Sequence, residues 1–264
     1  MWIGSLTTAF SGCEPAVYVS GDATVLCGWL SPLMLSVSPF TRAMSYRHLL
    51  TLLGIVLVVL GLIEGGWFLL AFWLGCDFLA LGVAHGRGLH SVFGKRANGT
   101  LPLWSWFVFL PLLIYTTVVW HLIRLFSREP PRNAVTEQLV VGRRLLASEL
   151  DGEFDNFVDL TAEFPEPPSI RSSPSYRSFP ILDGGAPTPE ALRAAVASLR
   201  PGRTFVHCAQ GHGRTGLFAL AVLLSSGVAR TVEDGMRMLS EVRPAIRLSR
   251  EQHKCIQIYA ENVG

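Results

Sequence analysis

The sequence predicts an α/β domain with a mostly parallel central sheet flanked by helices, preceded by a helical transmembrane region. Half of the 264 residues are hydrophobic and only 16% are charged, whereas soluble domains are about a quarter charged. The charges are also unevenly distributed. Residues 1–128 hold seven Lys/Arg and four Asp/Glu, and residues 129–264 hold fifteen and sixteen. Two regions that face different solvents are therefore expected.

The membrane region is predicted over residues 44–128, from three apolar runs. Leu49–Ile63 and Trp67–Ala84 are each interrupted by one polar residue, and Leu101–Ile123 has tryptophans near both ends. A spanning helix needs about 20 apolar residues, and tryptophan is enriched where a helix meets the membrane surface. We expect two or three helices here, the last kinked at Pro111. Buried helices of a soluble protein are the disfavoured alternative.

Arginine and lysine flank all three apolar runs, and this bears on orientation. Each basic cluster favours the cytoplasmic side, yet three full crossings would put the last cluster opposite the middle one. Two crossings, or one re-entrant segment, would remove the conflict. We expect a multi-pass membrane protein with its soluble domain in the cytoplasm.

Residues 1–43 are rich in Ser, Thr, Gly and Pro and lack the features of a signal peptide. Met44 immediately precedes the first apolar run, as the start of a membrane protein would. We expect residues 1–43 to be a poorly defined segment that is not translated in the natural protein.

The soluble domain is predicted over residues 133–264, because Glu129-Pro130-Pro131 ends the last apolar run. Strands alternate with helices in this part, which indicates a parallel sheet. The expected strands are Gln138–Leu145, Phe157–Thr161, Ser178–Leu182 and Thr204–His207. The expected helices are Thr188–Leu199, Thr215–Ser225 and Val232–Val242, with a loop over Phe164–Ser175.

A glycine-containing turn joins the last strand to an apolar helix and reads His207-Cys208-Ala209-Gln210-Gly211-His212-Gly213-Arg214-Thr215-Gly216. Its backbone N–H groups and the positive end of the helix would form an anion cradle. Arg214 would add a charged fork for two phosphate oxygens, and the same field favours the nucleophilic thiolate of Cys208. The residues expected to contact a phosphoryl group are Ala209, Gln210, Gly211, His212, Gly213 and Arg214.

This stretch resembles the signature of the protein tyrosine and dual-specificity phosphatase superfamily, in which His-Cys is followed after five residues by Arg-Ser/Thr. The resemblance covers about residues 133–264, and the membrane half resembles the anchors of some bacterial members. It implies a phosphocysteine intermediate on Cys208, with Thr215 helping the thiolate to leave and His207 supporting it. The alternatives are that Thr215 caps the helix and that His207 is an ordinary buried histidine.

Phosphoryl transfer also needs an acid that protonates the leaving oxygen. Asp183 follows a strand, precedes a helix and resembles the general acid of the family. It could instead be a simple turn residue before two glycines. Asp155 and Asp159 are rivals, although Asp159 lies within an apolar strand.

The remaining candidates are less specific. His212 could touch substrate, Gln252 could orient water, and Glu241–Leu248 resembles a segment that packs behind the phosphate loop. The five cysteines form no CxxC pair, so no metal site is expected. None of the five needs a disulfide, which fits a protein domain in a reducing compartment. The alternative is that Cys255 forms a redox pair with Cys208. The other three are Cys13, Cys27 and Cys76.

The sequence therefore predicts a membrane-anchored, cysteine-dependent phosphomonoesterase of the dual-specificity or tyrosine protein phosphatase type. Its expected partners are a phosphorylated protein substrate and the lipid bilayer; no cofactor is expected, and a net charge of +2 gives no support to a nucleic-acid partner. The alternative is a lipid phosphatase with a substrate of the phosphatidylglycerophosphate type. Ala209 and His212 stand where relatives that act on phosphoinositides tend to carry lysine, so a polyanionic inositol headgroup is the less expected lipid substrate. A catalytically inactive phospho-binding module is the third possibility.

Overall fold

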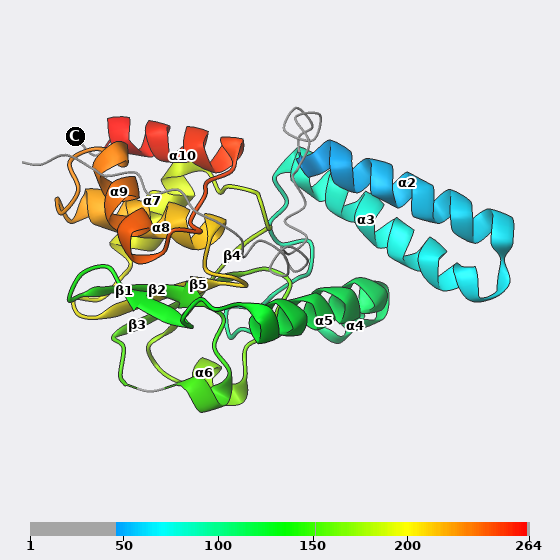
Figure 1. The fold of residues 1–264 in the computed structure, drawn as a ribbon, viewed down its shortest axis with the longest axis horizontal. Coiled ribbons are helices and arrows are strands. Elements are labelled where there is room, and N and C mark those ends of the chain that lie inside the picture. The colour runs from blue at the N-terminus through cyan, green and yellow to red at the C-terminus, as the bar shows by residue number, and fades with distance from the viewer. Residues whose placement is uncertain (1–45, 151, 263–264) are drawn as a thin grey trace, which may run out of the picture. The chain divides into compact units, whose positions relative to one another are not determined.

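The computed structural model describes residues 46–150 and 152–262 (Figure 1). The expectation for residues 1–43 lies outside the described residues. The described part of the chain starts with a pair of long apolar helices, and an α/β domain follows, in the order that the sequence predicts.

The first two apolar runs form a helical hairpin. Helix α2 (Tyr46–Glu64) is followed by η1 (Gly66–Phe68) and α3 (Leu69–Arg87). The turn between them contains Gly65 and Gly66, whose φ angles of 62° and 52° lie in the left-handed region that glycine adopts at low cost. The chain thus reverses its direction within a few residues, and the run Leu49–Ala84 is a hairpin of two helices.

Glycines let the two helices approach closely. A Cβ atom on Gly54 would lie 2.8 Å from Leu79 Cγ, and one on Gly75 would lie 2.8 Å from the backbone nitrogen of Val58. Small residues at such contacts are typical of helix pairs in membranes. Within the described residues, two helices, Tyr46–Glu64 and Gly66–Arg87, are long and apolar enough to cross a membrane.

The third apolar run does not form one long helix. It contains α4 (Leu103–Val108) and α5 (Leu110–Phe126), separated at Phe109, whose φ of −104° departs from helical geometry. The interruption lies two residues before Pro111, which confirms the predicted kink. One side of α5 is buried in a cluster with Ala162 and Leu182 of the α/β domain, so this run packs on the domain that follows it.

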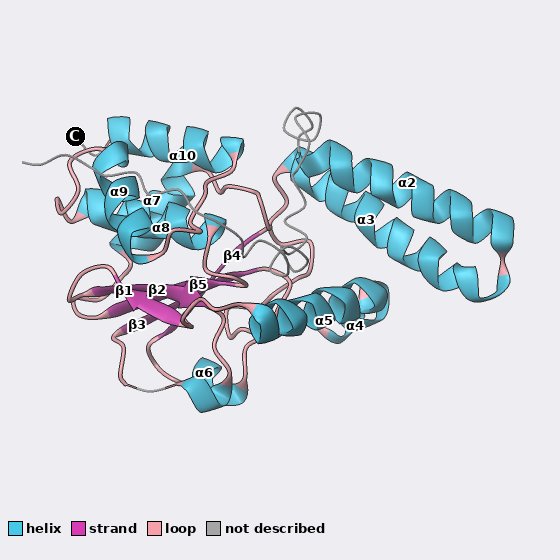
Figure 2. Cartoon of the chain, viewed as in Figure 1, coloured by secondary structure: helices cyan, strands magenta, loops and turns pink. Residues whose placement is uncertain are grey.

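The α/β domain is built on a five-stranded sheet in the order β1-β2-β5-β3-β4 (Figure 2). Strands β2, β5, β3 and β4 are parallel, and β1 pairs antiparallel with β2 at one edge. The predicted fold class is confirmed. The strands are β1 (Arg132–Ala134), β2 (Leu139–Arg143), β3 (Asn156–Thr161), β4 (Tyr176–Ile181) and β5 (Thr204–Cys208).

Alternate residues of each strand enter two different cores, as the period of two in a strand requires. Val141 and Val206 pack with the helices α7 to α10, which cover one face of the sheet in Figure 1. Val140 and Phe205 pack with Ile170 of α6 on the other side. These helices are α6 (Pro168–Arg171), α7 (Pro189–Ala197), α8 (Gly213–Ser225), α9 (Val232–Val242) and α10 (Arg250–Glu261), and η2 (Ala147–Glu149) follows β2.

Most predicted elements agree with the structure within two or three residues, and α9 agrees at both ends. Four elements of the α/β domain were not predicted, namely β1, η2, α6 and α10. Helix α6 lies inside the predicted loop Phe164–Ser175, and α10 follows the last predicted helix. Ser249 and Gln252 form a capping box at the start of α10, and this Ser-x-x-Gln pattern is a sequence signal for a helix start.

Candidate active site

The candidate nucleophile lies where β5 ends and α8 begins, at the carboxyl edge of the parallel strands. Cys208 is the last residue of β5 and is 4% exposed. The backbone N–H of Gly211 donates a hydrogen bond to its Sγ atom at 3.3 Å. The turn therefore curls over the sulfur with at least one amide pointing inward, as an anion cradle requires.

The carbonyl groups of the turn point outward, because buried donors bind them from behind. Arg243 is 2% exposed and donates to the carbonyls of Gln210 at 2.9 Å and Gly211 at 3.0 Å. It is held in turn by Glu129 at 3.0 Å and by Asn133. With these carbonyls bound outside, the amides of the turn are free to face the cradle.

Helix α5 supplies a second support for the turn. The indole Nε1 of Trp120, which is 1% exposed, donates to the carbonyl of Ala209 at 2.9 Å. The guanidinium of Arg144 lies 5.2 Å from the centre of the same ring, close enough for a cation–π interaction. The third apolar run thus contacts the Cys208 loop directly.

Two glycines of the turn are required by close contacts. Gly211 has a φ of 76°, and a Cβ there would lie 2.4 Å from the carbonyl carbon and oxygen of Gly142 on β2. A Cβ on Gly213 would lie 2.8 Å from Gln252 Oε1. Both positions exclude larger residues because the neighbouring atoms are fixed backbone or buried side chain.

Arg214 is held in place by two carboxylates. Its two terminal nitrogens each lie 2.8 Å from an oxygen of Glu163, and Nη1 also donates to the carbonyl of Ile181 at 3.0 Å. Asp183 Oδ1 lies 3.2 Å from Nη2. Burial disfavours the charged guanidinium, but Glu163 and Asp183 keep the pKa of Arg214 well above its usual value. The fork is therefore charged and oriented before any substrate binds.

The structure brings Asp183 to the candidate nucleophile and leaves its two rivals elsewhere. Asp183 lines the same cavity of about 320 Å³ as Cys208 and Arg214, and its side chain is 67% exposed. Asp155 accepts a hydrogen bond from the backbone nitrogen of Arg203 at 2.7 Å. Asp159 is fully buried in β3. Neither rival lines that cavity.

Asp159 forms a buried ion pair with a lysine from outside the predicted soluble domain. Lys95 Nζ lies 2.5 Å from Asp159 Oδ2 and also donates to the carbonyl and hydroxyl oxygens of Thr161. Tyr176 donates its hydroxyl to the same carboxylate at 2.6 Å. Burial alone would raise the pKa of Asp159, but Lys95 brings it below its usual value. Asp159 is thus a structural anion.

Ligand atoms of Asp159, Glu166 and His207 lie within 4.8 Å of one another, a spacing that a metal ion could bridge. The ammonium group of Lys95 already supplies the positive charge beside Asp159. Burial, followed by the charge of Asp159, raises the pKa of Glu166 to about 7 despite its contact with Arg144 at 2.7 Å. The cluster therefore has the chemistry of a buried ionic network.

His207, which precedes the candidate nucleophile, is held in its neutral form by burial. It is fully buried, stacks on Phe205 with an interplanar angle of 16°, and meets Phe157 at an angle of 64°. Burial lowers its pKa to about 4, although Asp159, 3.9 Å away, acts in the opposite direction. A neutral ring places no full positive charge beside Cys208, whereas the charged guanidinium of Arg214 lines the same cavity.

The other candidates have identifiable surroundings. The Thr215 hydroxyl is buried and has no hydrogen-bond partner among the described residues. His212 lines the cavity and lies 2.8 Å from Glu129. Gln252 donates to the carbonyl of Gly185 at 2.9 Å, beside Asp183 in the chain. Cys255 contacts the carbonyl of Pro187, and burial raises its pKa to about 11.

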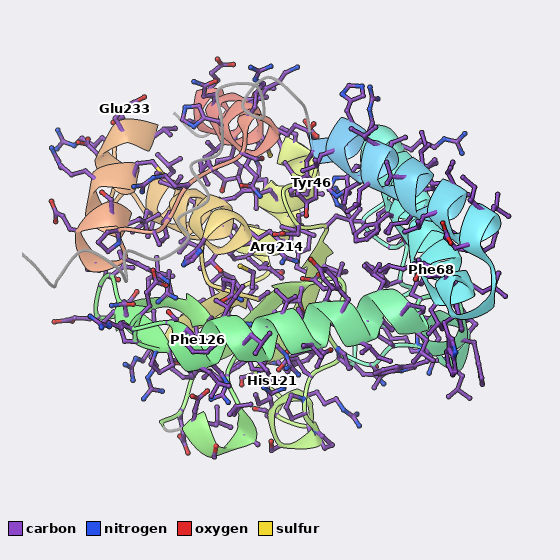
Figure 3. The ribbon with its side chains drawn as sticks, turned by 45° about the vertical axis from the view of Figure 1, so that its right-hand side comes forward. Tyr46, Phe68, His121, Phe126, Arg214 and Glu233 are labelled. Atoms are coloured by element: carbon purple, nitrogen blue, oxygen red, sulfur yellow. The ribbon has the colours of Figure 1, made fainter. Side chains whose placement is uncertain are left out.

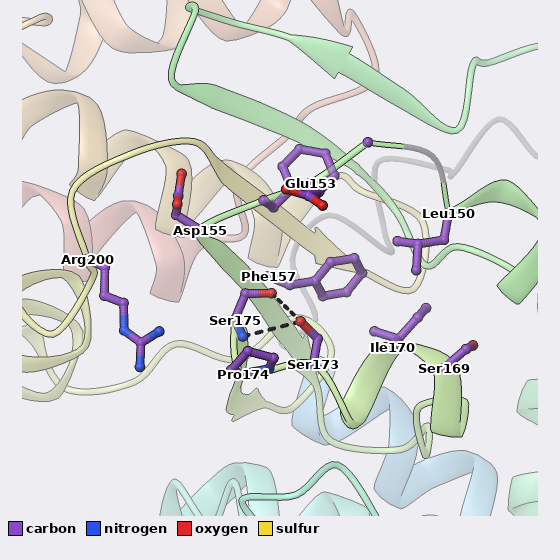
Figure 4. Close-up of a pocket in the computed structure, with 12 residues that line it drawn as sticks. Leu150, Glu153, Asp155, Phe157, Ser169, Ile170, Ser173, Pro174, Ser175 and Arg200 are labelled. Carbon is purple, nitrogen blue, oxygen red and sulfur yellow. Dashed lines mark hydrogen bonds between the residues drawn. The ribbon is translucent and has the colours of Figure 1, made fainter.

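The outer wall of the cavity comes from the apolar half of the chain. Tyr46 of α2 and Tyr115, Val119 and Ile123 of α5 line it, and Figure 3 shows the positions of Arg214 and Tyr46 and of Phe126 at the end of α5. A larger cavity of about 510 Å³ lies at the amino ends of β3 and β4 (Figure 4). Parallel sheets bind ligands at their carboxyl ends, so the smaller cavity is the candidate active site.

Four important residues were not identified from the sequence. Glu163 and Arg243 orient the loop and its arginine, whereas Lys95 and Trp120 come from the chain before the predicted α/β domain. Glu163 lies in the polar end of the apolar stretch before the predicted loop, and Arg243 lies in a segment that was expected behind the loop. In the sequence Lys95 is one of several basic residues that flank an apolar run, and this pattern does not indicate that it pairs with Asp159.

No protein-family model and no curated protein matches the chain. Among solved structures, the chain is similar to Tk-PTP in its active form, at 22% identity over 50% of this chain and 97% of that one, with a TM-score of 0.45. It is similar to PTPMT1 in complex with PI(5)P, at 13% identity over 51% and 97%, with a TM-score of 0.45. It is also similar to a mouse putative dual specificity phosphatase complexed with zinc tungstate, at 16% identity over 52% and 91%, with a TM-score of 0.43.

Proposed function

We propose that this protein is a membrane-anchored phosphomonoesterase of the dual-specificity or tyrosine phosphatase type, acting through a phosphocysteine intermediate. The observation that supports it most is the cradle itself. Cys208 Sγ lies under the amide of Gly211, with the carbonyls of the turn bound from outside and with Arg214 held beside it by Glu163. Such a site matches a dianionic phosphoryl group and a thiolate nucleophile.

In the first step the thiolate of Cys208 attacks phosphorus, and the bond from phosphorus to the substrate oxygen breaks. Asp183 donates its proton to that departing oxygen. The loop amides and Arg214 bind the phosphoryl oxygens on which charge is spread in the transition state. The products of this step are the free alcohol or phenol and a phosphocysteine.

In the second step water attacks the phosphocysteine, and the carboxylate of Asp183 accepts its proton. The sulfur–phosphorus bond breaks, inorganic phosphate leaves, and the thiolate and the protonated acid are restored. The hydroxyl of Thr215, which is buried at the start of α8, would stabilise the departing thiolate by a hydrogen bond.

A lipid phosphate is the second candidate substrate, and the cavity wall favours it. Tyr46 and the α5 residues that line the cavity adjoin an exposed apolar surface of α5, formed by Ile114, Val118, Leu122 and Phe126. Exposed apolar surface of this kind marks a membrane or protein contact. A phosphate monoester at the bilayer surface could enter the cradle while its acyl chains stay beside α5.

We further propose that α2 and α3 cross the membrane as a hairpin, with the α/β domain on the cytoplasmic side. A hairpin of two crossings returns the chain to its starting side. It thereby places the basic residues before α2 and after α3, such as Arg47, Arg87 and Lys95, on one side, as the positive-inside rule requires.

The mechanism is tested with the full chain in detergent micelles and p-nitrophenyl phosphate as substrate. We expect turnover that vanadate inhibits and chelators leave unchanged, and that Cys208→Ser abolishes. Cys76→Ser is the matched control, because Cys76 is exposed on α3. Activity that survived Cys208→Ser would contradict the mechanism. Phosphate binding without any turnover would support an inactive binding module.

The substrate class is tested by comparing phosphotyrosine and phosphoserine peptides with phosphatidylglycerophosphate in vesicles of neutral lipid. A kcat/KM at least about tenfold higher for one class would correspond to about 1.4 kcal/mol of preferential transition-state binding. Preference for the peptides would support the protein phosphatase, and preference for the vesicles would support the lipid phosphatase.

A further inference from the structure

The loop that carries Asp183 is held by hydrogen bonds to four successive backbone carbonyls. Three of the donors come from α10 and its cap within the α/β domain, and the fourth comes from the segment between α3 and α4. The bonds are Ser249 Oγ to Gly184 at 2.8 Å, Gln252 Nε2 to Gly185 at 2.9 Å, His90 Nε2 to Ala186 at 2.9 Å, and Cys255 Sγ to Pro187 at 3.2 Å.

His90 differs from the other three because it binds the loop on both sides of Asp183. Its Nδ1 accepts a hydrogen bond from the backbone N–H of Leu182 at 3.3 Å, and its Nε2 donates to the carbonyl of Ala186. An imidazole that accepts at one nitrogen and donates at the other is the neutral Nε2–H tautomer. Burial lowers the pKa of His90, in agreement with that assignment.

The position of Asp183 depends on the backbone of this loop more than on packing of its own side chain. The side chain is 67% exposed, and its ion pair is with Arg214 at 3.2 Å. Arg214 must bind substrate oxygens, so that contact cannot fix the acid throughout the reaction. The two bonds of His90 enclose the turn that determines where the carboxyl group points.

We propose that His90 is a positioning residue that holds Asp183 in the geometry for proton donation to the leaving group. The inference rests on the proposed function, since it takes Asp183 as the general acid. It assigns a role in catalysis to the connection between α3 and α4, which lies outside the predicted α/β domain of residues 133–264. The apolar half of the chain then contributes to the chemistry as well as to anchoring.

A positioning role differs from a merely structural one in its dependence on the leaving group. A phenyl phosphate releases a basic phenolate and needs its proton in the transition state, whereas 2,4-dinitrophenyl phosphate releases a stable anion and needs none. Misplacing the acid therefore slows the first substrate selectively. General unfolding or loss of the cradle slows both substrates alike.

The experiment measures kcat/KM of the full chain in micelles on both substrates. His90→Phe keeps a ring but removes both the donor and the acceptor, and His90→Asn restores one of each. We expect His90→Phe to lose about 10- to 100-fold on phenyl phosphate and less than about threefold on the dinitrophenyl ester, with His90→Asn recovering most of the loss. His253→Phe, on the exposed side of α10, is the matched control and should be unaffected.

Equal losses of His90→Phe on the two substrates, or no loss on either, would overturn the proposal. Asp183→Ala is measured in parallel to separate this result from a failure of the proposed function. If Asp183→Ala is selective for phenyl phosphate and His90→Phe is not, only the role of His90 is wrong. If Asp183→Ala is not selective either, the assigned acid is wrong and the role of His90 falls with it. Activity in Cys208→Ser would refute the cysteine mechanism itself.

Discussion

Replacing Lys95 by methionine tests whether the segment after α3 is part of the core of the α/β domain. The ammonium group is 1% exposed and the carboxylate of Asp159 is fully buried, with 2.5 Å between them. Methionine has nearly the same length without the charge. In Lys95→Met the carboxylate would keep its hydrogen bonds from Tyr176 and Thr161 and lose its counter-charge.

Removing one partner of a buried ion pair costs about 3–5 kcal/mol, because the remaining charge is left uncompensated. At about 2–4 °C per kcal/mol for a domain of 150–250 residues, the midpoint of unfolding of Lys95→Met should fall by about 6–20 °C. Adding Asp159→Asn removes the orphaned charge, so the double variant should be more stable than the sum of the two single changes predicts.

Thermal unfolding of the full chain in micelles, followed by near-ultraviolet circular dichroism, measures these shifts. Lys254→Met is the control, because Lys254 is the other lysine of the chain and is exposed on α10. A midpoint of Lys95→Met within about 2 °C of the wild type, or a double variant with strictly additive losses, would refute the reasoning.

Three further predictions concern the loop, its histidine and the hairpin. Gly211→Ala should lower kcat/KM by at least about 100-fold with phosphate binding lost in parallel, because its Cβ would overlap the backbone of β2; retained turnover would argue against the cradle. His207 has a pKa lowered from 6.5 to about 4, so its stabilising neutral form is fully present above pH 6.5 and is lost as the pH falls toward 4. This contribution to the free energy of unfolding is about 3 kcal/mol. It is measured by chemical unfolding of the wild type and of His207→Gln at each pH. The difference between the two is needed because Glu166, with a pKa raised to about 7, changes the stability in the opposite direction over the same pH range. Gly54→Leu should separate α2 from α3 and destabilise the hairpin by about 1–3 kcal/mol, measured as protease resistance in micelles, whereas Val56→Leu on the exposed side of α2 should not.

Local patterns in the sequence predicted the four parallel strands, most of the helices and the position of the Cys208 loop. The buried strands are short apolar runs, and the turn from β5 has its two glycines and its arginine immediately before or within the first turn of the apolar helix α8. Such features depend on backbone conformation over a few residues, so they leave a readable local signal. The candidate acid, Asp183, was identified in the same way, from a turn between a strand and a helix.

The contacts that complete the candidate site leave no such signal, because they join residues far apart in the chain. Lys95 is 64 residues from Asp159, and His90 is 96 residues from Ala186. In the sequence both residues belong to a short polar connection after an apolar helix. That pattern is equally typical of a membrane-flanking loop, so their inward orientation could not be predicted.

The sequence alone determined that the chain has an apolar half and a charged half, and that the charged half carries a cysteine, a glycine turn and an arginine at a strand-to-helix junction. Composition and local spacing are sufficient for such conclusions, since burial and turn geometry select residue types. Only the tertiary structure decided that the two halves share a site. Trp120, His90 and Lys95 reach the α/β domain because buried hydrogen-bonding and charged groups must find partners wherever the folded chain brings them together.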